Sequence, residues 1–267
     1  MNGKIFNHKT ARNLLLVTAS LATVYVGASP ASAFTVGSLN PQSLPGTQAN
    51  KAPYTIEITT ADIGKTFKTY WILEGVTSEP LRAKGYFKVT DFTSSALSLE
   101  TSFSNQTDAS FKAAVTSIGL GVTPNATGVS FSSAGQVFDS AYVETGNQRF
   151  PGGYKNIDIC ISSVSTNNSG NCQGGGINSG LQSGGNEDNF NINIAGNYGQ
   201  DPITVLQTLP VKFQTTQASY TLMASKPHTV PTPPATLGLF ALGALGMVST
   251  LKRNLKHKQK STQPIIY

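Results

Sequence analysis

The feature that most constrains the fold is an alternation of apolar and polar side chains in the central part of the chain. In the segment YTIEITT, residues 54–60, aromatic or aliphatic residues occupy every second position. Successive side chains of a β-strand point to opposite faces, so this period predicts a strand in a sheet with one solvent-exposed face. Further candidate strands follow at 66–75, 84–92, 96–103, 113–122, 129–131, 156–162, 190–195, 211–214 and 220–223.

Short strands separated by turn residues predict an all-β fold. The connections hold Gly, Asn, Ser and Pro, and no stretch of about eleven residues between 54 and 225 has clear helical periodicity, although 201–208 fits a short helical turn. Many short strands at near-regular spacing favour one antiparallel β-sandwich-like domain over an open barrel. We predict this domain at residues 54–225, with Trp71 in its core and a Gly-rich disulfide loop.

The first 33 residues have the pattern of a secretory signal peptide. Three basic residues and no carboxylate precede an apolar stretch from Leu14 to Ala28. The small residues Ala31 and Ala33 fit the pockets of signal peptidase, which predicts cleavage before Phe34. An apolar stretch of about fifteen residues is shorter than the roughly 20 that span a bilayer, which disfavours a retained membrane helix. We therefore predict export through the secretion translocon.

A second apolar segment, at residues 235–251, carries no charge and precedes a basic tail at 252–267. Its length as a helix is about 26 Å, enough for a thin hydrocarbon core, and it is apolar on every face, unlike a typical core helix. The tail begins with Lys252, Arg253, Lys256 and Lys258, and such residues stay on the cytoplasmic side. We predict a transmembrane helix with the preceding domain outside.

The positive charge of the chain belongs to its two ends. The chain has a formal net charge of +6, but eight of its nineteen Lys and Arg residues lie in the two end segments. All thirteen carboxylates and the other eleven bases lie in residues 34–230, whose net charge is therefore near −2. These charges are scattered and form no basic stripe, which argues against a nucleic-acid partner.

Cys160 and Cys172 are the only two cysteines, and both lie in the part predicted to be exported. A disulfide is the default state there, and closing this loop would stabilise the fold by roughly 3 kcal/mol. Zinc is the alternative, but the only histidines, His8, His228 and His257, lie outside the predicted domain. We therefore predict no metal and no cofactor.

Two segments beside the domain have the composition of loosely held chain. Residues 34–53 are rich in Pro, Gly, Ser, Asn and Gln, which predicts a flexible N-terminal arm. Residues 226–234, KPHTVPTPP, hold four prolines, which favour an extended linker that cannot join a helix or a central strand.

The predicted domain lacks the residues for most hydrolytic chemistry. A Ser-His-Asp or Cys-His arrangement needs an imidazole, and the domain has none. A pair of carboxylates is enough for a glycosidase, and Asp158, Glu187 and Asp188 lie near the disulfide loop in sequence. Such enzymes also line a groove with aromatic residues, whereas Trp71 lies within a candidate strand. We predict that the protein is not an enzyme.

A glycine-rich passage runs from Cys160 to Asn193 and includes three consecutive glycines at 174–176. A phosphate-binding loop would need a following helix and, in P-loops, a lysine, and this passage has neither. Residues 186–189, NEDN, offer oxygen ligands for Ca²⁺, but their spacing matches no known calcium loop. We favour a solvated turn at the tip of a hairpin.

The C-terminal features together resemble a bacterial sorting signal. The motif Val230-Pro231-Thr232-Pro233, the glycine-spaced apolar segment and the basic cluster are similar to the PEP-CTERM signal of Gram-negative bacteria. In that family the motif usually reads Val-Pro-Glu-Pro and is recognised by an exosortase, a membrane protease. Thr232 replaces the acidic residue here. The resemblance implies sorting at the membrane, with the domain held there or released to the cell surface or extracellular matrix.

Four sequence runs are similar to cyanobacterial PEP-CTERM proteins of the cistern family. They are VTSIGLGVTPN at 115–125, FPGGYKNIDICI at 150–161, NCQGGGINSGL at 171–181 and VKFQT at 211–215. In that family two cysteines flank a short loop and glycines follow the second. The resemblance implies a cyanobacterial source and sorting at the membrane. It implies no activity.

These observations lead to one functional prediction and two alternatives. The first is an exported, non-enzymatic surface or extracellular-matrix protein. The second is a carbohydrate-binding module that meets extracellular polysaccharide with Tyr154 or Tyr198, although fold class alone supports it only weakly. The third is a glycoside hydrolase that uses Asp158 and Glu187.

Overall fold

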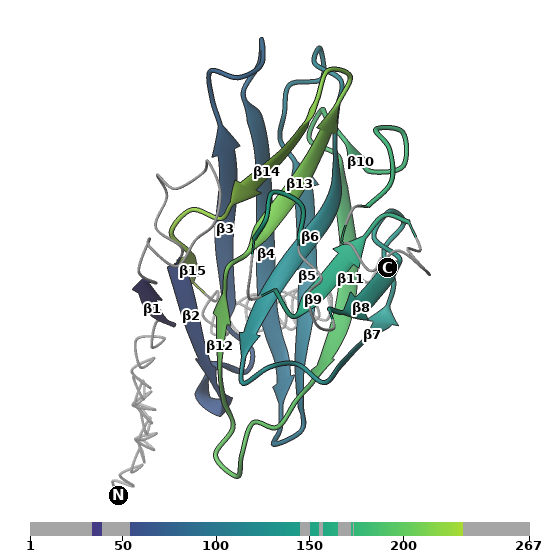
Figure 1. The fold of residues 1–267 in the computed structure, drawn as a ribbon. Coiled ribbons are helices and arrows are strands. Elements are labelled where there is room, and N and C mark those ends of the chain that lie inside the picture. The colour runs from purple at the N-terminus through teal and green to yellow at the C-terminus, as the bar shows by residue number, and fades with distance from the viewer. Residues whose placement is uncertain are drawn as a thin grey trace, which may run out of the picture. The chain divides into compact units, whose positions relative to one another are not determined.

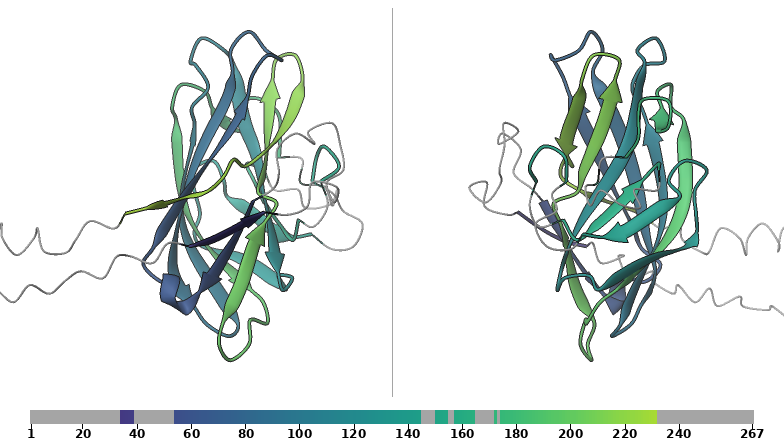
Figure 2. Two further views of the ribbon diagram at one scale, coloured as in Figure 1. Left: turned by 90° about the vertical axis from the view of Figure 1, so that its left-hand side faces the viewer. Right: turned by 45° about the vertical axis from the view of Figure 1, so that its right-hand side comes forward.

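The computed structural model describes residues 34–38, 54–144, 150–154, 157–164, 172 and 174–231. These residues form fifteen β-strands and one short 3₁₀ helix, η2 (Thr60–Asp62). The strands make two antiparallel sheets that face each other (Figure 1; Figure 2). The predicted all-β, sandwich-like fold is confirmed.

The first sheet has six strands. In spatial order they are β15 (His228–Val230), β3 (Thr66–Leu73), β4 (Leu81–Phe92), β5 (Ala96–Asn105), β11 (Glu187–Ala195) and β7 (Gly128–Ser133). Burial alternates along β3, β4, β5 and β11, as the sequence period predicts. One face of this sheet therefore packs inward and the other points away from the core.

The second sheet has nine strands. Its main path is β1 (Thr35–Ser38), β2 (Tyr54–Thr59), β12 (Ile203–Gln207), β6 (Ala113–Thr123), β13 (Pro210–Thr215) and β14 (Ser219–Met223). Two further strands also pair with β6, namely β9 (Ile159–Ser162) and β10 (Leu181–Gln182), and β8 (Ser140–Val143) pairs with β9.

The hydrophobic core lies between the sheets and includes Trp71, as predicted. The Trp71 side chain has no exposed surface, and its indole N–H donates a hydrogen bond of 2.8 Å to the carbonyl oxygen of Leu209. Its ring centroid lies 5.2 Å from that of Phe103. Trp71 thus joins a strand of the six-stranded sheet to the chain segment just before β13.

Strand β6 is buried on both faces. The strands β3, β4, β5 and β11 of the other sheet are buried mainly on one. Its inward side chains join the main core, and Phe150 packs against the opposite face at Gly119. A Cβ atom at Gly119 would lie 2.8 Å from the Phe150 ring, so this position needs glycine. A second, smaller core therefore covers the outer face of the nine-stranded sheet.

The predicted disulfide lies in this smaller core. Cys160 and Cys172 are bonded to each other, with Cα atoms 5.5 Å apart, and both side chains are fully buried. Phe150, Tyr154 and Met223 belong to the same cluster. The disulfide therefore ties Cys172 to strand β9 of the sheet.

Removing the disulfide should destabilise the domain measurably. Replacing Cys160 and Cys172 by serine together should lower the free energy of unfolding by roughly 3 kcal/mol, because the open loop gains chain entropy when the protein unfolds. Urea unfolding of the oxidised protein and of the double variant measures this difference. Equal midpoints would show that the packing of the loop holds it without the covalent link.

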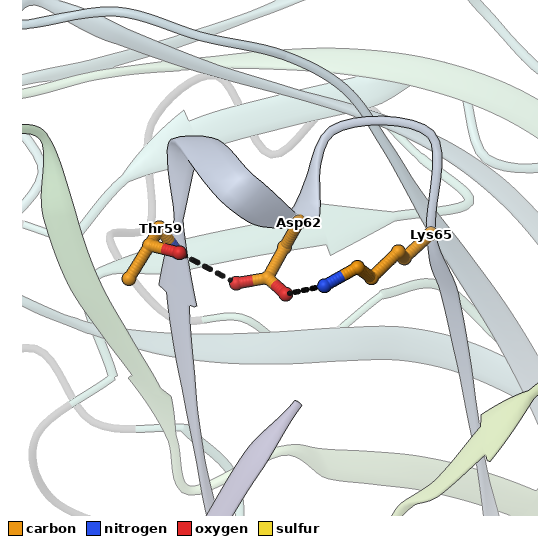
Figure 3. A network of polar contacts seen from close by, with 3 residues as sticks. All are labelled: Thr59, Asp62 and Lys65. Carbon is orange, nitrogen blue, oxygen red and sulfur yellow. Dashed lines mark hydrogen bonds and ion pairs between the residues drawn. The ribbon is translucent and has the colours of Figure 1, made fainter. Parts of the chain in front are cut away.

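A short turn connects the two sheets at the end of β2. The carboxylate of Asp62 accepts hydrogen bonds from the backbone N–H and hydroxyl of Thr59, at 2.9 and 3.0 Å, and from the Lys65 ammonium at 2.9 Å (Figure 3). Gly64 follows with a φ of 85° and donates its N–H to Val89 of β4 at 2.7 Å. The turn is thereby fixed to the sheet into which the chain passes.

Three sequence predictions about local structure were wrong. Phe34 is buried against Phe67, at 5.3 Å between ring centroids, and residues 35–38 form the edge strand β1, so the flexible arm does not begin at Phe34. Residues 203–207 form β12 and no helical turn, because their period of two matches a half-buried strand. The predicted linker 226–234 contributes β15, an edge strand beside β3. An edge position is the one that its prolines permit.

Several sequence predictions lie outside the described residues. They are the signal peptide with Ala31 and Ala33, most of the arm at 39–53, Thr232 and Pro233 of the sorting motif, the apolar segment 235–251 and the basic tail 252–267. Within the described part of the chain, no helix has the length and apolar character needed to cross a membrane.

Candidate binding face

The outer face of the six-stranded sheet is polar and exposed, which makes it the leading candidate for a functional surface. Its side chains alternate with the buried ones that form the core. The outer face of the nine-stranded sheet is different, because the disulfide cluster packs over its central strand β6. The two faces of the sandwich are therefore unequal, and only the first presents regular rows of polar side chains.

Two lysines and two tyrosines form a compact group on this face, which we call the Lys–Tyr quartet: Lys68 and Tyr70 of β3, and Lys84 and Tyr86 of β4. The antiparallel register places Lys68 opposite Tyr86, and Tyr70 opposite Lys84. The Lys68 Nζ lies 5.9 Å from the centroid of the Tyr70 ring, and the Lys84 Nζ lies 5.1 Å from that of Tyr86. Each ammonium group therefore lies over an aromatic ring of its own strand.

A shallow groove of about 380 Å³ adjoins the quartet. Tyr86 forms part of its lining, together with Ser102 of β5 and with Asn189 and Asn191 of β11. The side chains of Ser102, Asn189 and Asn191 have no hydrogen-bond partner among the described residues. Hydroxyl and amide groups both donate and accept, so the groove offers free hydrogen-bonding capacity to a polar ligand.

The quartet keeps two positive charges that no described carboxylate neutralises. Lys88 pairs with Glu100 at 3.0 Å, and Arg82 with Glu74 at 3.7 Å. Within the described part of the chain, Lys68 and Lys84 have no such partner. The cations of the quartet are consequently available to an external anion.

The three carboxylates considered for hydrolysis are divided between the two sheets. Asp158 precedes β9 of the nine-stranded sheet and accepts a hydrogen bond of 2.7 Å from the backbone N–H of Val122. Burial raises its pKa. Glu187 is exposed at the start of β11, in the other sheet, and the neighbouring Asp188 is buried. Asp158 and Glu187 thus belong to different sheets of the sandwich.

The glycine-rich passage has a structural explanation. Gly174 is buried with a φ of 52°, and a Cβ atom there would overlap the carbonyl oxygen of Thr116 in β6. Gly174 therefore allows the chain to approach the sheet closely at this point. Gly184 and Gly185, with φ of 95° and 77°, do lie exposed in the turn between β10 and β11.

Two of the four side chains considered for calcium, Asp188 and Asn186, already make hydrogen bonds within the chain. The Asp188 carboxylate accepts hydrogen bonds from the backbone N–H groups of Gln136, Val137 and Phe138, at 2.7 to 3.0 Å. The amide group of Asn186 donates to two backbone carbonyls of its own turn. These contacts leave no converging set of oxygen ligands in residues 186–189.

Glu144 lies beside the disulfide. Its carboxylate and the two sulfur atoms lie within 4.8 Å of one another, but sulfurs in a disulfide are not the thiolates that bind metal ions. Burial raises the pKa of Glu144 to about 7, against a smaller opposing effect of the hydrogen bond from the Cys172 backbone.

This raised pKa predicts a pH dependence of stability. The carboxyl of Glu144 ordinarily titrates at 4.5 and does so at about 7 in the folded protein, so the folded state binds more protons between these values. Stability should therefore be greatest below about pH 4.5 for this group and fall as the pH rises to about 7. Replacing Glu144 by Gln should flatten the curve of melting temperature against pH over that range. An unchanged slope would assign it to other groups, such as Asp158.

The two tyrosines that the sequence analysis assigned to carbohydrate binding are core residues. Tyr154 and Tyr198 are only 2% and 3% exposed, and burial raises the pKa of each to about 12. His228, which we had placed outside the folded region, lies on the edge strand β15 opposite Lys68. It is exposed and adjoins the candidate face.

Sequence reasoning missed the Lys–Tyr quartet, although a signal was present. The pattern Lys-x-Tyr occurs twice, at 68–70 and at 84–86, within two predicted strands. Positions two apart in a strand share a face, so each pattern predicts a lysine beside a tyrosine. What the sequence did not show is that the two strands are neighbours in the register that joins the pairs.

Comparisons with known proteins do not identify a family for this chain. No protein-family model matches the chain, and neither the curated proteins nor the solved structures contain a match to it. The functional argument therefore depends on the sequence and on the geometry described above.

Proposed function

We propose that this chain is an exported, non-enzymatic protein of the cell surface or extracellular matrix that binds polysaccharide with the outer face of its six-stranded sheet. The observation that carries the proposal is this open, polar face with its Lys–Tyr quartet, built on a rigid sheet. Binding surfaces on regular elements are held more precisely than those on loops. The face suits binding to an extended polymer better than chemistry on a small molecule, because its groove is shallow.

Export is supported by three independent features. The N-terminal pattern of residues 1–33 predicts a substrate of the translocon and signal peptidase. The buried disulfide between Cys160 and Cys172 is typical of proteins in oxidising compartments. From the C-terminal resemblance to PEP-CTERM signals, we propose that an exosortase processes the chain. Residues 235–251 would anchor it in the membrane until processing occurs.

Fractionation of cells of the native host tests this proposal. One epitope tag is placed in the exposed turn at Ser94 and Ser95, between β4 and β5, and a second after Lys260. We expect the first tag outside the cytoplasm. Separation of the two tags would show processing near Pro233, and their joint migration in membranes would show a permanent anchor. Recovery of both tags in the cytosol would contradict the proposal.

A further inference from the structure

Resting on the proposed polysaccharide binding, we infer that the ligand of this face is an acidic polysaccharide whose carboxylate or sulfate groups pair with Lys68 and Lys84. The inference concerns the chemistry of the ligand and goes beyond the location of the face. It depends on the charges, on the free hydrogen-bonding groups and on the way these lie in rows across the sheet.

The lysines on β3 and β4 differ in whether a carboxylate pairs with them. Lys88 lies directly opposite Glu100 and is neutralised by it, as its 3.0 Å contact shows. Lys68 and Lys84 instead lie over tyrosine rings, which attract a cation without cancelling its charge. An anion that approaches the quartet therefore meets two ammonium groups that no carboxylate of the described residues neutralises.

One row of side chains crosses four strands from the quartet into the groove. The register aligns Lys68 of β3, Tyr86 of β4, Ser102 of β5 and Asn189 of β11. Three spacings between adjacent strands of about 4.8 Å give the row a length of roughly 14 Å. It combines a cation, an aromatic ring, a hydroxyl and an amide, which are the groups that recognise an acidic sugar, its ring face and its hydroxyls.

The neighbouring rows show why this one is favoured. The row through Tyr70 and Lys84 continues to Ser104 and to the exposed carboxylate of Glu187, which would repel an anion at that end. The row through Lys88 and Glu100 is internally neutralised. The most favourable binding position for a negatively charged polymer is therefore along the row of Lys68, with Lys84 beside it.

A phospholipid surface is a less suitable occupant of the groove. Membrane-surface binding combines cations with exposed aliphatic or aromatic groups that enter the lipid. The large exposed hydrophobic residues of the described chain are Ile63, Ile72, Val76 and Ile203. Only Ile72 is in the β3 or β4 strand of the quartet, and none of the four lines the groove. The groove is lined instead by hydroxyl, amide and charged groups around Tyr86 and Phe190.

The test uses two polymers that differ only in charge. The full chain, purified in mild detergent, is passed over immobilised polygalacturonate and over the same polymer with its carboxyl groups methyl-esterified. We expect binding to the acid form that is at least about tenfold stronger than to the ester, and that weakens as sodium chloride rises from about 50 to 500 mM, because salt screens charge pairs. Dextran serves as a neutral polymer of different structure.

Variants locate the binding. The double variant Lys68→Gln and Lys84→Gln should bind polygalacturonate at least about tenfold more weakly, because both cations of the quartet are lost. Tyr86→Ala should weaken binding without changing net charge. The matched control is a double variant of equal charge change, Lys112→Gln with Lys226→Gln, neither of which lines the groove. It should bind like the parent, and all variants should keep the parent's melting temperature within a few degrees.

Different results would contradict different parts of the proposal. Equal binding to the acid and the ester would overturn the inference and leave polysaccharide binding in place. Binding of dextran alone would do the same. Equal weakening in both double variants would overturn the assignment to the quartet. Binding to vesicles that contain phosphatidylserine, with none to polygalacturonate, would overturn it in favour of a membrane surface. No binding to any polymer, together with a cytosolic location, would reject the proposed function itself.

Discussion

Replacing Asp188 by Ala should lower the free energy of unfolding by about 4 kcal/mol, because a buried carboxylate that satisfies three backbone N–H groups would be lost. Asp188 is 3% exposed, and it accepts hydrogen bonds from Gln136, Val137 and Phe138. These residues lie between β7 and β8, so one side chain holds the connection between the two sheets. Without it, three backbone N–H groups would lose their acceptor, and that of Phe138 is buried.

Two further variants make this prediction specific. Asp188→Asn keeps one acceptor oxygen in nearly the same volume and should lose less stability than Asp188→Ala. Glu187→Ala removes the adjacent, exposed carboxylate and should change stability by no more than about 0.5 kcal/mol. Urea unfolding followed by tryptophan fluorescence compares the three. An Asp188→Ala midpoint equal to that of Glu187→Ala would show that the connection does not need the carboxylate.

Replacing Trp71 by Ala should cost a similar amount, about 4 kcal/mol, because it leaves a large cavity between the sheets and an unpaired carbonyl at Leu209. The site is closely fitted, since a Cβ atom added at Gly85 would lie 3.2 Å from the indole ring. Differential scanning calorimetry should show a melting temperature lowered by well over 5 °C for a domain of this size.

The preceding residue provides the matched control for Trp71. Tyr70 occupies the same strand and points to the opposite face, where it belongs to the Lys–Tyr quartet. Tyr70→Ala should therefore leave the melting temperature nearly unchanged and weaken polysaccharide binding. If instead both variants unfold at equally low temperature, the outer face would be part of the stabilising structure and could not be assigned to binding alone.

The strands that the sequence predicted best are those with one buried and one exposed face. Residues 84–92 and 96–103 fall within β4 and β5, where the alternation of burial follows the alternation of residue types. Strand β6 was also found, from its apolar run, although the sequence did not show that both of its faces are covered. The disulfide was predicted from the number of cysteines and their expected compartment, and its geometry agrees.

The missed elements depend on partners that lie far away in the sequence. Strand β1 is short and polar, and only its pairing with β2 and the burial of Phe34 hold it in place. The need for glycine at position 174 was missed because its contact, the backbone at Thr116, belongs to a distant strand. The Lys–Tyr quartet was missed for the same reason, since it depends on the register between β3 and β4.

The most direct test of the central claim is a map of the residues that respond to ligand. Backbone amide signals of isotope-labelled protein are followed by NMR while a short oligogalacturonate is added. The account predicts the largest shifts at Lys68, Tyr86, Ser102 and Asn189, on adjacent strands of the six-stranded sheet. Shifts confined to the disulfide cluster around Cys160, or no shifts at saturating ligand, would contradict the claim that this face binds acidic polysaccharide.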